Sequence, residues 1–293
     1  MKRLLIIGCG DVVRRALPTL LSHWRVLALV RRHDPALQAL GIAQIVGDLD
    51  QPRSLGRLAG IADAVIHSAP PPGEGAADPR TARLLAVLGR AKSLPRSVVY
   101  IGTTGVYGDC GGDHIEETRP LAPRSARTRR RADAERRLRE FGRRSGCRVT
   151  LLRAPGIYAP DRLPLDRLRQ GTPVPLPEED AYSNHIHADD LARACIAALR
   201  RGRPNRVINV VDDTELKMGD WFDKLADAFA LPRPPRLPYA EMERHLTPMQ
   251  RSFMGESRRI ANRRLKTELH SRLHYPTVED GIAAALKKSQ GAS

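Results

Sequence analysis

Two glycines, Gly8 and Gly10, follow the apolar run at residues 4–7 and precede a segment with helical character that begins at Asp11. A strand, a tight glycine turn and a helix start form the entry to a βαβ unit that can bind a dinucleotide. Glycine lets the backbone bend sharply and approach a diphosphate, whose charge meets the free N–H groups and positive dipole end of the helix. An ordinary tight turn explains the same spacing equally well.

Two residues weaken the dinucleotide interpretation. Val13 stands where the third glycine of G-x-G-x-x-G would fall, and its side chain would push helix and strand apart. Pro18 lies within the expected helix, where it should remove a hydrogen bond and kink the chain. Asp11 can cap the helix, but its charge would sit near the phosphates. If a dinucleotide binds, the expected contacts at this turn are Gly8, Gly10, Asp11 and Val12.

Arg31 and Arg32 follow the second buried strand, at residues 26–30. In NAD-binding folds an acidic residue near this point holds the ribose 2′-hydroxyl. A guanidinium can instead pair with the 2′-phosphate of NADP, which an acid would repel. The two arginines therefore favour NADP, with NAD as the alternative, provided that the site exists. The competing explanation is that they are two of many surface arginines.

The elements that must position these residues alternate between strand and helix. Apolar runs without polar alternation are typical of parallel strands covered on both faces. We expect such strands at residues 4–7, 26–30, 43–46, 64–67, 97–101, 149–153 and 207–211. Helices are expected between them at residues 35–40, 54–58, 81–91 and 125–142. This order predicts an α/β fold with a doubly wound parallel sheet of the Rossmann type.

The remainder of the chain predicts a smaller second domain. We assign residues 1–153, with residues 184–212 returning to them, to the dinucleotide-binding domain. Residues 154–183 and 213–293 then form a discontinuous substrate-binding subdomain. Helices are expected there at residues 164–170, 218–230, 258–269 and 278–286, with a helix and loop at 242–254; a further helix, 189–199, belongs to the returning segment. The proline-rich stretch 231–238 is interpreted as a linker within this subdomain.

Length and composition narrow the class of protein. The 293 residues can bury a substantial core, and no run approaches the ~20 apolar residues that a membrane span needs. We therefore expect a cytoplasmic protein that does not bind membranes. The cysteines are scattered and form no C-x-x-C pair, so reduced thiols are expected rather than a disulfide framework or a metal site. They are Cys9, Cys110, Cys147 and Cys195.

The formal net charge is +16, and arginine is densest between residues 124 and 144. Such an excess could indicate a nucleic-acid partner. However, no zinc-finger, RNA-binding or helix-turn-helix pattern accompanies it, and acidic residues interrupt the dense stretch. A solvated arginine-rich surface is the favoured explanation.

Several motifs occur in a characteristic order along the chain: GCGD at 8–11, GDL at 47–49, IGTTGVYG at 101–108, RAPGIY at 153–158 and NHIHADDLA at 184–192. In this order the chain resembles the NAD-dependent epimerase/dehydratase family, which are extended short-chain dehydrogenases/reductases. The resemblance implies a dinucleotide lying across the ends of strands one to five and a small-molecule substrate. It adds the following expected cofactor contacts: Asp48, Leu49, Ala69, Pro70 and Pro155.

The resemblance also implies the catalytic positions, and here the chain departs from the family. Thr103 matches the Ser/Thr that hydrogen-bonds the substrate. The Tyr-x-x-x-Lys pair that transfers the proton corresponds to Arg127 and Arg131, and residues 125–139 contain neither tyrosine nor lysine. Arginine stays protonated and cannot serve as a general base. Arg131 could still hold ribose or phosphate, whereas Arg127 cannot replace a tyrosine.

Three hypotheses remain open. The first is an NADP-dependent oxidoreductase or epimerase-like enzyme whose acid/base lies elsewhere. Tyr107 is the first candidate for that group, although packing of its loop is the more ordinary explanation. The second is an NADP(H)-binding sensor or scaffold without turnover, and the third, ranked last, is a nucleic-acid-binding protein. The other titratable candidates are Tyr158, His185 and His187.

An anionic substrate could meet Arg258, Arg259 and Arg263. A homodimer is compatible with all three hypotheses.

Overall fold

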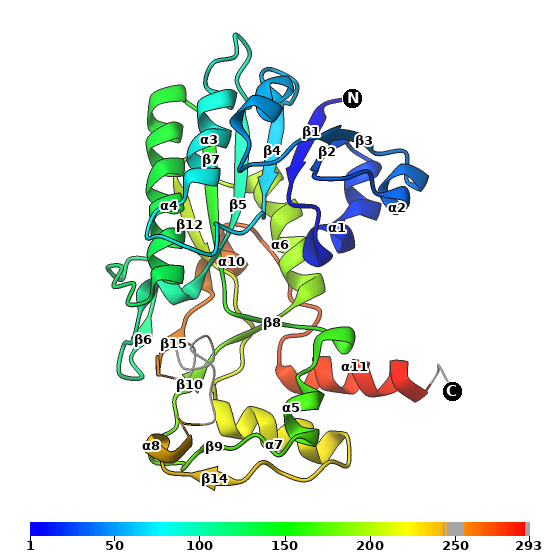
Figure 1. The fold of residues 1–293 in the computed structure, drawn as a ribbon. Helices are drawn as coiled ribbons and strands as arrows, with labels where there is room; N and C mark the ends of the chain where they lie inside the picture. The colour runs from blue at the N-terminus through cyan, green and yellow to red at the C-terminus, as the bar shows by residue number, and fades with distance from the viewer. Residues whose placement is uncertain (243, 245–254, 291–293) are drawn as a thin grey trace.

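The computed structural model describes residues 1–242, 244 and 255–290, and its centre is a seven-stranded sheet (Figure 1). The strands are β1 (Arg3–Ile7), β2 (Arg25–Val30), β3 (Ala43–Val46), β4 (Ala64–His67), β5 (Ser97–Thr103), β7 (Arg148–Ala154) and β12 (Arg206–Asn209). Their order is β12-β7-β5-β4-β1-β2-β3, and every neighbouring pair is parallel. The strand order reverses between β1 and β4, which is where open α/β sheets bind ligands. The predicted doubly wound fold is confirmed.

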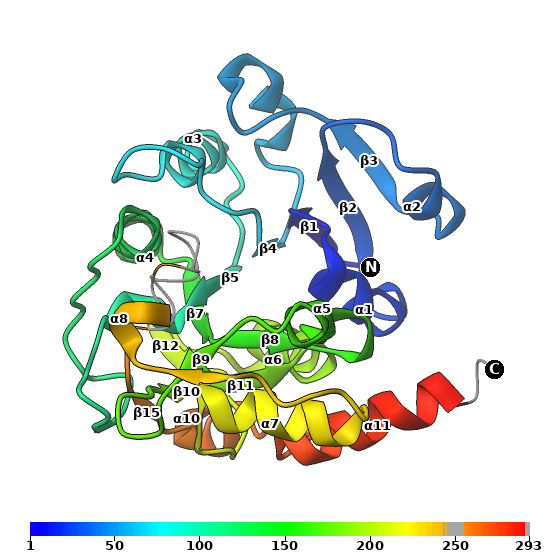
Figure 2. The same cartoon turned by 60° about the horizontal axis from the view of Figure 1, so that its bottom comes forward.

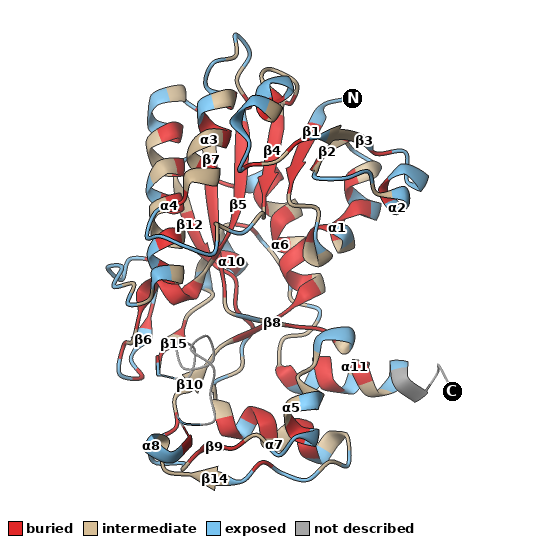
Figure 3. Ribbon diagram, in the orientation of Figure 1, coloured by how far each residue is buried: buried red, intermediate tan, exposed pale blue. Residues whose placement is uncertain are grey.

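Helices cover both faces of this sheet (Figures 1 and 3). One face carries α1 (Asp11–Leu21), α2 (Pro35–Ala39), α6 (Ala188–Arg201) and α10 (Arg263–Thr267). The other carries the 3₁₀ helix η1 (Pro52–Leu58), α3 (Pro79–Leu88) and α4 (Ala126–Ser145). Alternate residues of β1 enter different cores: Leu4 packs with the first group and Leu5 with the second. Burial on both faces explains why the strand sequences lack polar alternation.

The first helix differs from expectation at two points. Helix α1 runs from Asp11 to Leu21 without interruption, although Pro18 lies inside it. Its N-cap is Gly10, and no side chain caps it, so the expected capping role of Asp11 is wrong. Val13 is buried in the core between α1 and the sheet. The helix therefore accommodates a valine where the family pattern has glycine.

The C-terminal elements lie mostly below the sheet in Figure 1. They include β8 (Gly156–Tyr158), η3 (Pro160–Arg162), α5 (Leu165–Arg169), β9 (Val174–Pro175), β10 (Tyr182–Ser183), β11 (His185–His187), β13 (Leu216–Lys217), α7 (Met218–Ala228), β14 (Arg236–Leu237), α8 (Tyr239–Met242) and α11 (Val278–Gln290). Several of them, among them α5, α7 and α11, share a third hydrophobic cluster around Trp221 and Phe222. The division of the chain into two domains stays a prediction.

Two expectations for this part are corrected. The helix expected over 258–269 begins only at Arg263, because Arg259–Ile260 forms β15 and pairs in parallel with β6 (His114–Ile115). The proline-rich stretch is not a simple linker, since its strand β14 pairs with β9 (Figure 1). Of the helix and loop expected at 242–254, only residues 242 and 244 are described, and the rest lies outside the described residues.

Within the described part of the chain, each helix is too short or too polar to cross a bilayer. The same residues contain no group of three or more His, Cys, Asp or Glu side chains placed to hold a metal ion. The four cysteines are free thiols, with Cys9 partly buried and the other three buried.

Candidate dinucleotide and substrate site

The glycine turn between β1 and α1 forms an open cradle. Gly8 has φ +89°, and a Cβ there would lie 2.5 Å from the backbone nitrogen of Ala69 at the end of β4. Only glycine satisfies both constraints. A Cβ at Gly10 would meet no atom within 4 Å. The first N–H groups of α1, at Asp11 and Val12, have no partner within the helix, so the turn leaves room and donors for a diphosphate.

Asp11 forms ion pairs with two arginines. Arg15 Nε donates to Asp11 Oδ1 at 3.0 Å, and Arg162 Nη1 donates to Oδ2 at 3.0 Å. Arg15 also donates to Asp161 at 2.8 Å and to Asp189 at 3.0 Å. These contacts offset part of the charge with which Asp11 would repel a phosphate. The i,i+4 spacing of Asp11 and Arg15 on one helix is a signal that could have revealed this pair, whereas Arg162 and the further carboxylates are distant in the chain.

The carboxyl end of β2 presents cations. Arg31 and Arg32 are exposed there, as the sequence predicts. The nearby carboxylate of Asp34 is engaged: it accepts from Ala36 N at 3.0 Å as the N-cap of α2 and forms an ion pair with Arg14. This pairing lowers the pKa of Asp34. The acid next to the arginines is therefore already matched by a cation.

The ends of β3 and β4 carry the next expected contacts, and Arg80 links them. Arg80 Nε donates to Asp50 Oδ1 at 3.0 Å, and its Nη1 donates to the Pro70 carbonyl at 3.1 Å. Asp48 lies just before, partly exposed, and accepts from Asp50 N at 2.9 Å. Leu49 is buried, whereas Ala69 is partly buried and Pro70 exposed. Arg80, which nothing in the sequence singled out, holds the two loops together.

Thr103 ends β5 at the same edge of the sheet. Its Oγ1 accepts from Gly105 N at 3.2 Å and caps the 3₁₀ helix η2 (Thr104–Tyr107). Thr103 is partly exposed, whereas Thr104 is buried. The hydroxyl of Thr103 is thus the one of the two that a substrate could reach.

Arg131 reaches from α4 to the end of β5. Its Nη1 donates to the Tyr100 hydroxyl at 3.1 Å and to the Ile101 carbonyl at 3.2 Å. Tyr100 is fully buried with its ring 5.2 Å from that of His67, and burial raises the pKa of its phenol although Arg131 opposes the shift. Tyr100 therefore stays protonated and anchors Arg131.

A second group of charges surrounds η2. Arg127 lies one helical turn before Arg131 and is partly buried, and desolvation lowers its pKa. Arg258 Nη1 donates to the Gly108 carbonyl and to Glu256 Oε2, each at 2.7 Å. Arg131, Arg258 and Glu256 all act electrostatically on Arg127. Three arginines and one glutamate therefore lie together beside η2.

The other titratable candidates are committed to internal contacts. Tyr107 is buried and donates to Asn209 Oδ1 at 2.6 Å. Tyr158 donates to the Thr277 carbonyl at 3.2 Å, and His187 caps α6 by accepting from Asp189 N. The buried His185 ring lies 4.6 Å from that of Trp221. These contacts favour structural roles, and an acid/base role for any of these residues stays a prediction without support. Pro155, expected at the cofactor, is partly exposed after β7.

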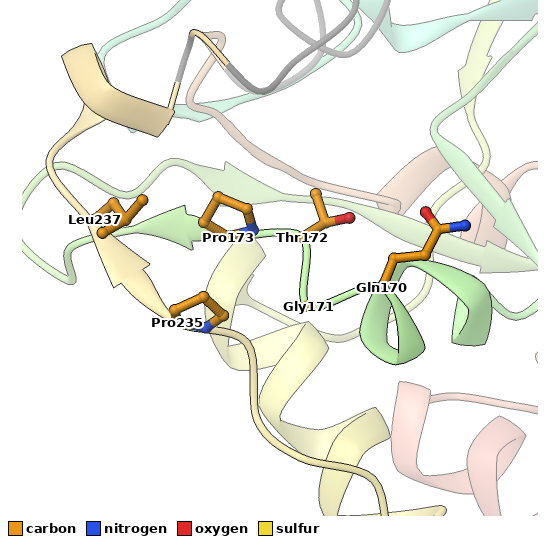
Figure 4. Close-up of a pocket in the computed structure, with 6 residues that line it drawn as sticks. All are labelled: Gln170, Gly171, Thr172, Pro173, Pro235 and Leu237. Carbon is orange, nitrogen blue, oxygen red and sulfur yellow. The ribbon is translucent and has the colours of Figure 1, made fainter.

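A cavity of about 390 Å³ lies away from the sheet edge, between the loop after α5 and β14 (Figure 4). Its lining contains no ionisable side chain and comprises Gln170, Gly171, Thr172, Pro173, Pro235 and Leu237. None of these lining residues is among the expected site residues.

A model of the NAD dependent epimerase/dehydratase family matches residues 9–210, which include Gly10, Thr103 and six of the seven strands of the sheet, all but β1. The chain belongs to the NAD-dependent epimerase/dehydratase family.

Solved structures with similar folds cover nearly the whole chain. A conserved protein of unknown function from Silicibacter pomeroyi is 29% identical, with a TM-score of 0.80, and the match covers 98% of this chain and 99% of that one. UDP-glucuronic acid 4-epimerase from Bacillus cereus, solved with NAD, is 18% identical, with a TM-score of 0.75 over 98% and 99% of the two chains. The dTDP-glucose 4,6-dehydratase DesIV from Streptomyces venezuelae is 21% identical, with a TM-score of 0.77 over 99% and 97%. The last two likenesses concern the fold alone.

Among curated proteins, a trifunctional UDP-glucose 4,6-dehydratase/UDP-4-keto-6-deoxy-D-glucose 3,5-epimerase/UDP-4-keto-L-rhamnose-reductase of Arabidopsis thaliana is 23% identical over 157 residues. The match covers 50% of this chain and 24% of that protein. This chain thus matches about a quarter of the length of that relative.

Proposed function

We propose that this epimerase/dehydratase-family protein binds NADP(H) along the carboxyl edge of its sheet and acts there on an anionic small molecule. The observation that carries the proposal is the cradle at the start of α1. Gly8 fits only without a side chain, Gly10 faces open space, and the carboxylate of Asp11 is paired with Arg15 and Arg162. These residues fit a diphosphate.

NADP is favoured over NAD by the charges after β2. Arg31 and Arg32 are exposed where the adenosine ribose of a bound dinucleotide would lie, and a guanidinium can pair with a 2′-phosphate. Asp34, the acid that could repel this phosphate, is matched by Arg14. With NAD, the same two arginines would meet an uncharged 2′-hydroxyl, which cannot form a charge-assisted pair with them.

An anionic substrate is favoured by the cluster of Arg127, Arg131 and Arg258 beside Thr103. The named relatives act on UDP- and dTDP-sugars, whose diphosphates carry such charge, and we extend that substrate class to this chain. The bound nicotinamide would supply or accept hydride. Thr103 would hydrogen-bond a substrate oxygen, and Arg131, fixed by Tyr100 and Ile101, would hold ribose or phosphate.

A sensor or scaffold without turnover is the second candidate, and one observation favours it. Neither position of the Tyr-x-x-x-Lys pair holds a group that accepts a proton at neutral pH, and the phenol of Tyr107 is bonded to Asn209. Cofactor binding alone would then be the function.

Fluorescence titration with NADPH and NADH tests cofactor binding. Wild-type protein should bind NADPH more tightly, and the double variant Arg31→Gln/Arg32→Gln should lose this preference by about tenfold or more, since charged pairs contribute about 1.5–3 kcal/mol. Arg57→Gln, at an exposed arginine of η1, is the matched control and should change nothing. Absence of saturable binding to either nucleotide would refute the proposal.

Turnover distinguishes the two candidates. The NADP(H)-bound protein is incubated with a panel of UDP- and dTDP-sugars and simple carbonyl compounds, and product is followed by mass spectrometry because epimerisation leaves no net change in nicotinamide absorbance. Conversion that falls in Thr103→Ala supports the enzyme. Tight NADPH binding without conversion of any anionic substrate favours the sensor.

A further inference from the structure

Arg162 and Arg15 both contact the carboxylate of Asp11, but their remaining contacts differ. Every nitrogen of the Arg15 guanidinium donates to a carboxylate: Nε to Asp11, Nη1 to Asp189 and Nη2 to Asp161. Its side chain is 21% exposed. Arg15 is therefore engaged at all three of its nitrogens, and it fixes the start of α1 against α6 and η3.

Arg162 has spare donors. Among the described residues its side chain makes one bond, from Nη1 to Asp11 Oδ2, and it is 38% exposed. A guanidinium has five N–H donors in a fixed planar fork, so four remain after this bond. The bond to Asp11, the first residue of α1, places these donors beside the free N–H groups that begin the helix.

The arginine comes from a distant part of the chain. It ends η3, which follows β8, whereas Asp11 follows β1; Figure 1 shows the start of α1 facing the segment after β8, and Figure 2 agrees. Asp161, one residue before Arg162, is held by Arg15 at 2.8 Å. The backbone that presents Arg162 is thus tied to α1 independently of Arg162 itself.

We infer that Arg162 is a binding residue for the diphosphate of the dinucleotide and that Arg15 is its positioning residue. The inference rests on the proposed NADP(H) site. The helix start supplies N–H donors and a partial positive charge but no formal cation. Arg162 can keep its bond to Asp11 and donate at the same time to a phosphate oxygen. A charge-assisted bond of this kind corresponds to about tenfold or more in affinity.

Calorimetry with three nucleotides isolates this contact. NADPH contains both the diphosphate and the 2′-phosphate, ADP-ribose contains only the diphosphate, and 2′-AMP contains only the 2′-phosphate. We expect Arg162→Gln to weaken the binding of NADPH and of ADP-ribose by about tenfold and to leave the affinity for 2′-AMP unchanged. Arg31→Gln/Arg32→Gln should give the opposite pattern, with ADP-ribose unchanged.

Two further variants complete the test. Arg169→Gln removes an exposed arginine of α5 that pairs with Asp166 and should leave all three affinities as in the wild type. Arg162→Lys retains the charge and should restore part of the affinity for ADP-ribose.

Unchanged ADP-ribose binding in Arg162→Gln, or an equal loss of affinity for all three nucleotides, would overturn the role of Arg162. Failure of the wild-type protein to bind any of them would overturn the proposed function itself.

Discussion

The phenol of Tyr107 donates a 2.6 Å hydrogen bond to Oδ1 of Asn209, which lies in the strand at the far edge of the sheet. Both side chains are buried, and the guanidinium carbon of Arg153 lies 4.6 Å from the centroid of the Tyr107 ring. Burial raises the pKa of this phenol. These contacts join the loop after β5 to β12 and hold Tyr107 as a neutral donor.

Tyr107→Phe should therefore lower the stability of the fold rather than the rate of turnover. Removal of the hydroxyl leaves the buried Asn209 oxygen without this donor, which costs about 1–3 kcal/mol. Urea denaturation measures the loss, and NADPH titration of the folded variant should match the wild type. Loss of turnover at unchanged stability would instead assign Tyr107 to catalysis.

The two glycines of the α1 turn should respond differently to alanine. At Gly8 a Cβ would approach Ala69 N to 2.5 Å at positive φ, so Gly8→Ala should destabilise the fold by ~1–2 kcal/mol from the backbone conformation alone. At Gly10 a Cβ meets nothing, so Gly10→Ala should keep its stability but lose NADPH affinity. Thermal unfolding and fluorescence titration on both variants check this. Wild-type affinity in Gly10→Ala would show that no ligand approaches the turn.

The Arg153–Glu135 pair lies in the core behind α4. It is bidentate, at 2.9 and 2.6 Å, and its side chains are 3% and 2% exposed. Glu135→Ala leaves a buried cation and should cost about 3–5 kcal/mol, whereas Glu135→Leu/Arg153→Met should recover most of the loss. Glu140→Ala, which breaks an exposed pair with Arg136, should cost under about 1 kcal/mol. Equal losses in the two single variants, measured in urea, would contradict this ranking.

Asp212 should make stability depend on pH. Desolvation raises its pKa from 3.8 to about 8, and within the described residues its Oδ2 has no hydrogen-bond partner. Between these values the folded state holds a proton that the unfolded chain lacks, so the free energy of unfolding should fall as pH rises from about 4 to 8. Each pKa unit corresponds to about 1.4 kcal/mol.

Asp212→Asn should remove this pH dependence of the free energy of unfolding. A comparison with the wild type then separates the effect of Asp212 from that of other titrating groups. Burial lowers the pKa of His185 to about 4, which gives the opposite slope between about 4 and 6.5 and is present in both proteins. The variant should therefore gain stability relative to the wild type at pH 8 and little at pH 4. A stability difference that is constant between pH 4 and 8 would exclude a raised pKa at Asp212.

The sheet and its order of elements could be predicted because the strands are buried on both faces, which leaves continuous apolar runs such as residues 64–67. Gly8 and Thr103 could be placed for the same reason, since each directly follows a strand and the carboxyl ends of parallel strands meet at one edge. The local sequence pattern suffices for these features because each strand, turn and helix is contiguous in the chain.

The partners of charged groups could not be predicted. Arg162 meets Asp11 across most of the chain, and only the fold brings them together. Sequence reasoning treated the charge of Asp11 as a defect, because one of its two ion pairs depends on that distant contact. The expected helix at 258–269 was wrong for a related reason: pairing of β15 with β6 prevails over the local helical pattern of Arg259–Ile260.

The pairing of β15 with β6 has a consequence for how the protein is made. During synthesis the N-terminal strands can assemble as they leave the ribosome. The loop that carries Thr103 and Tyr107 towards β6, however, acquires its neighbouring strand only after residue 260 has emerged. The nascent chain should therefore possess a folded sheet well before the candidate site at its carboxyl edge is complete. The rate of translation sets the time between the two events.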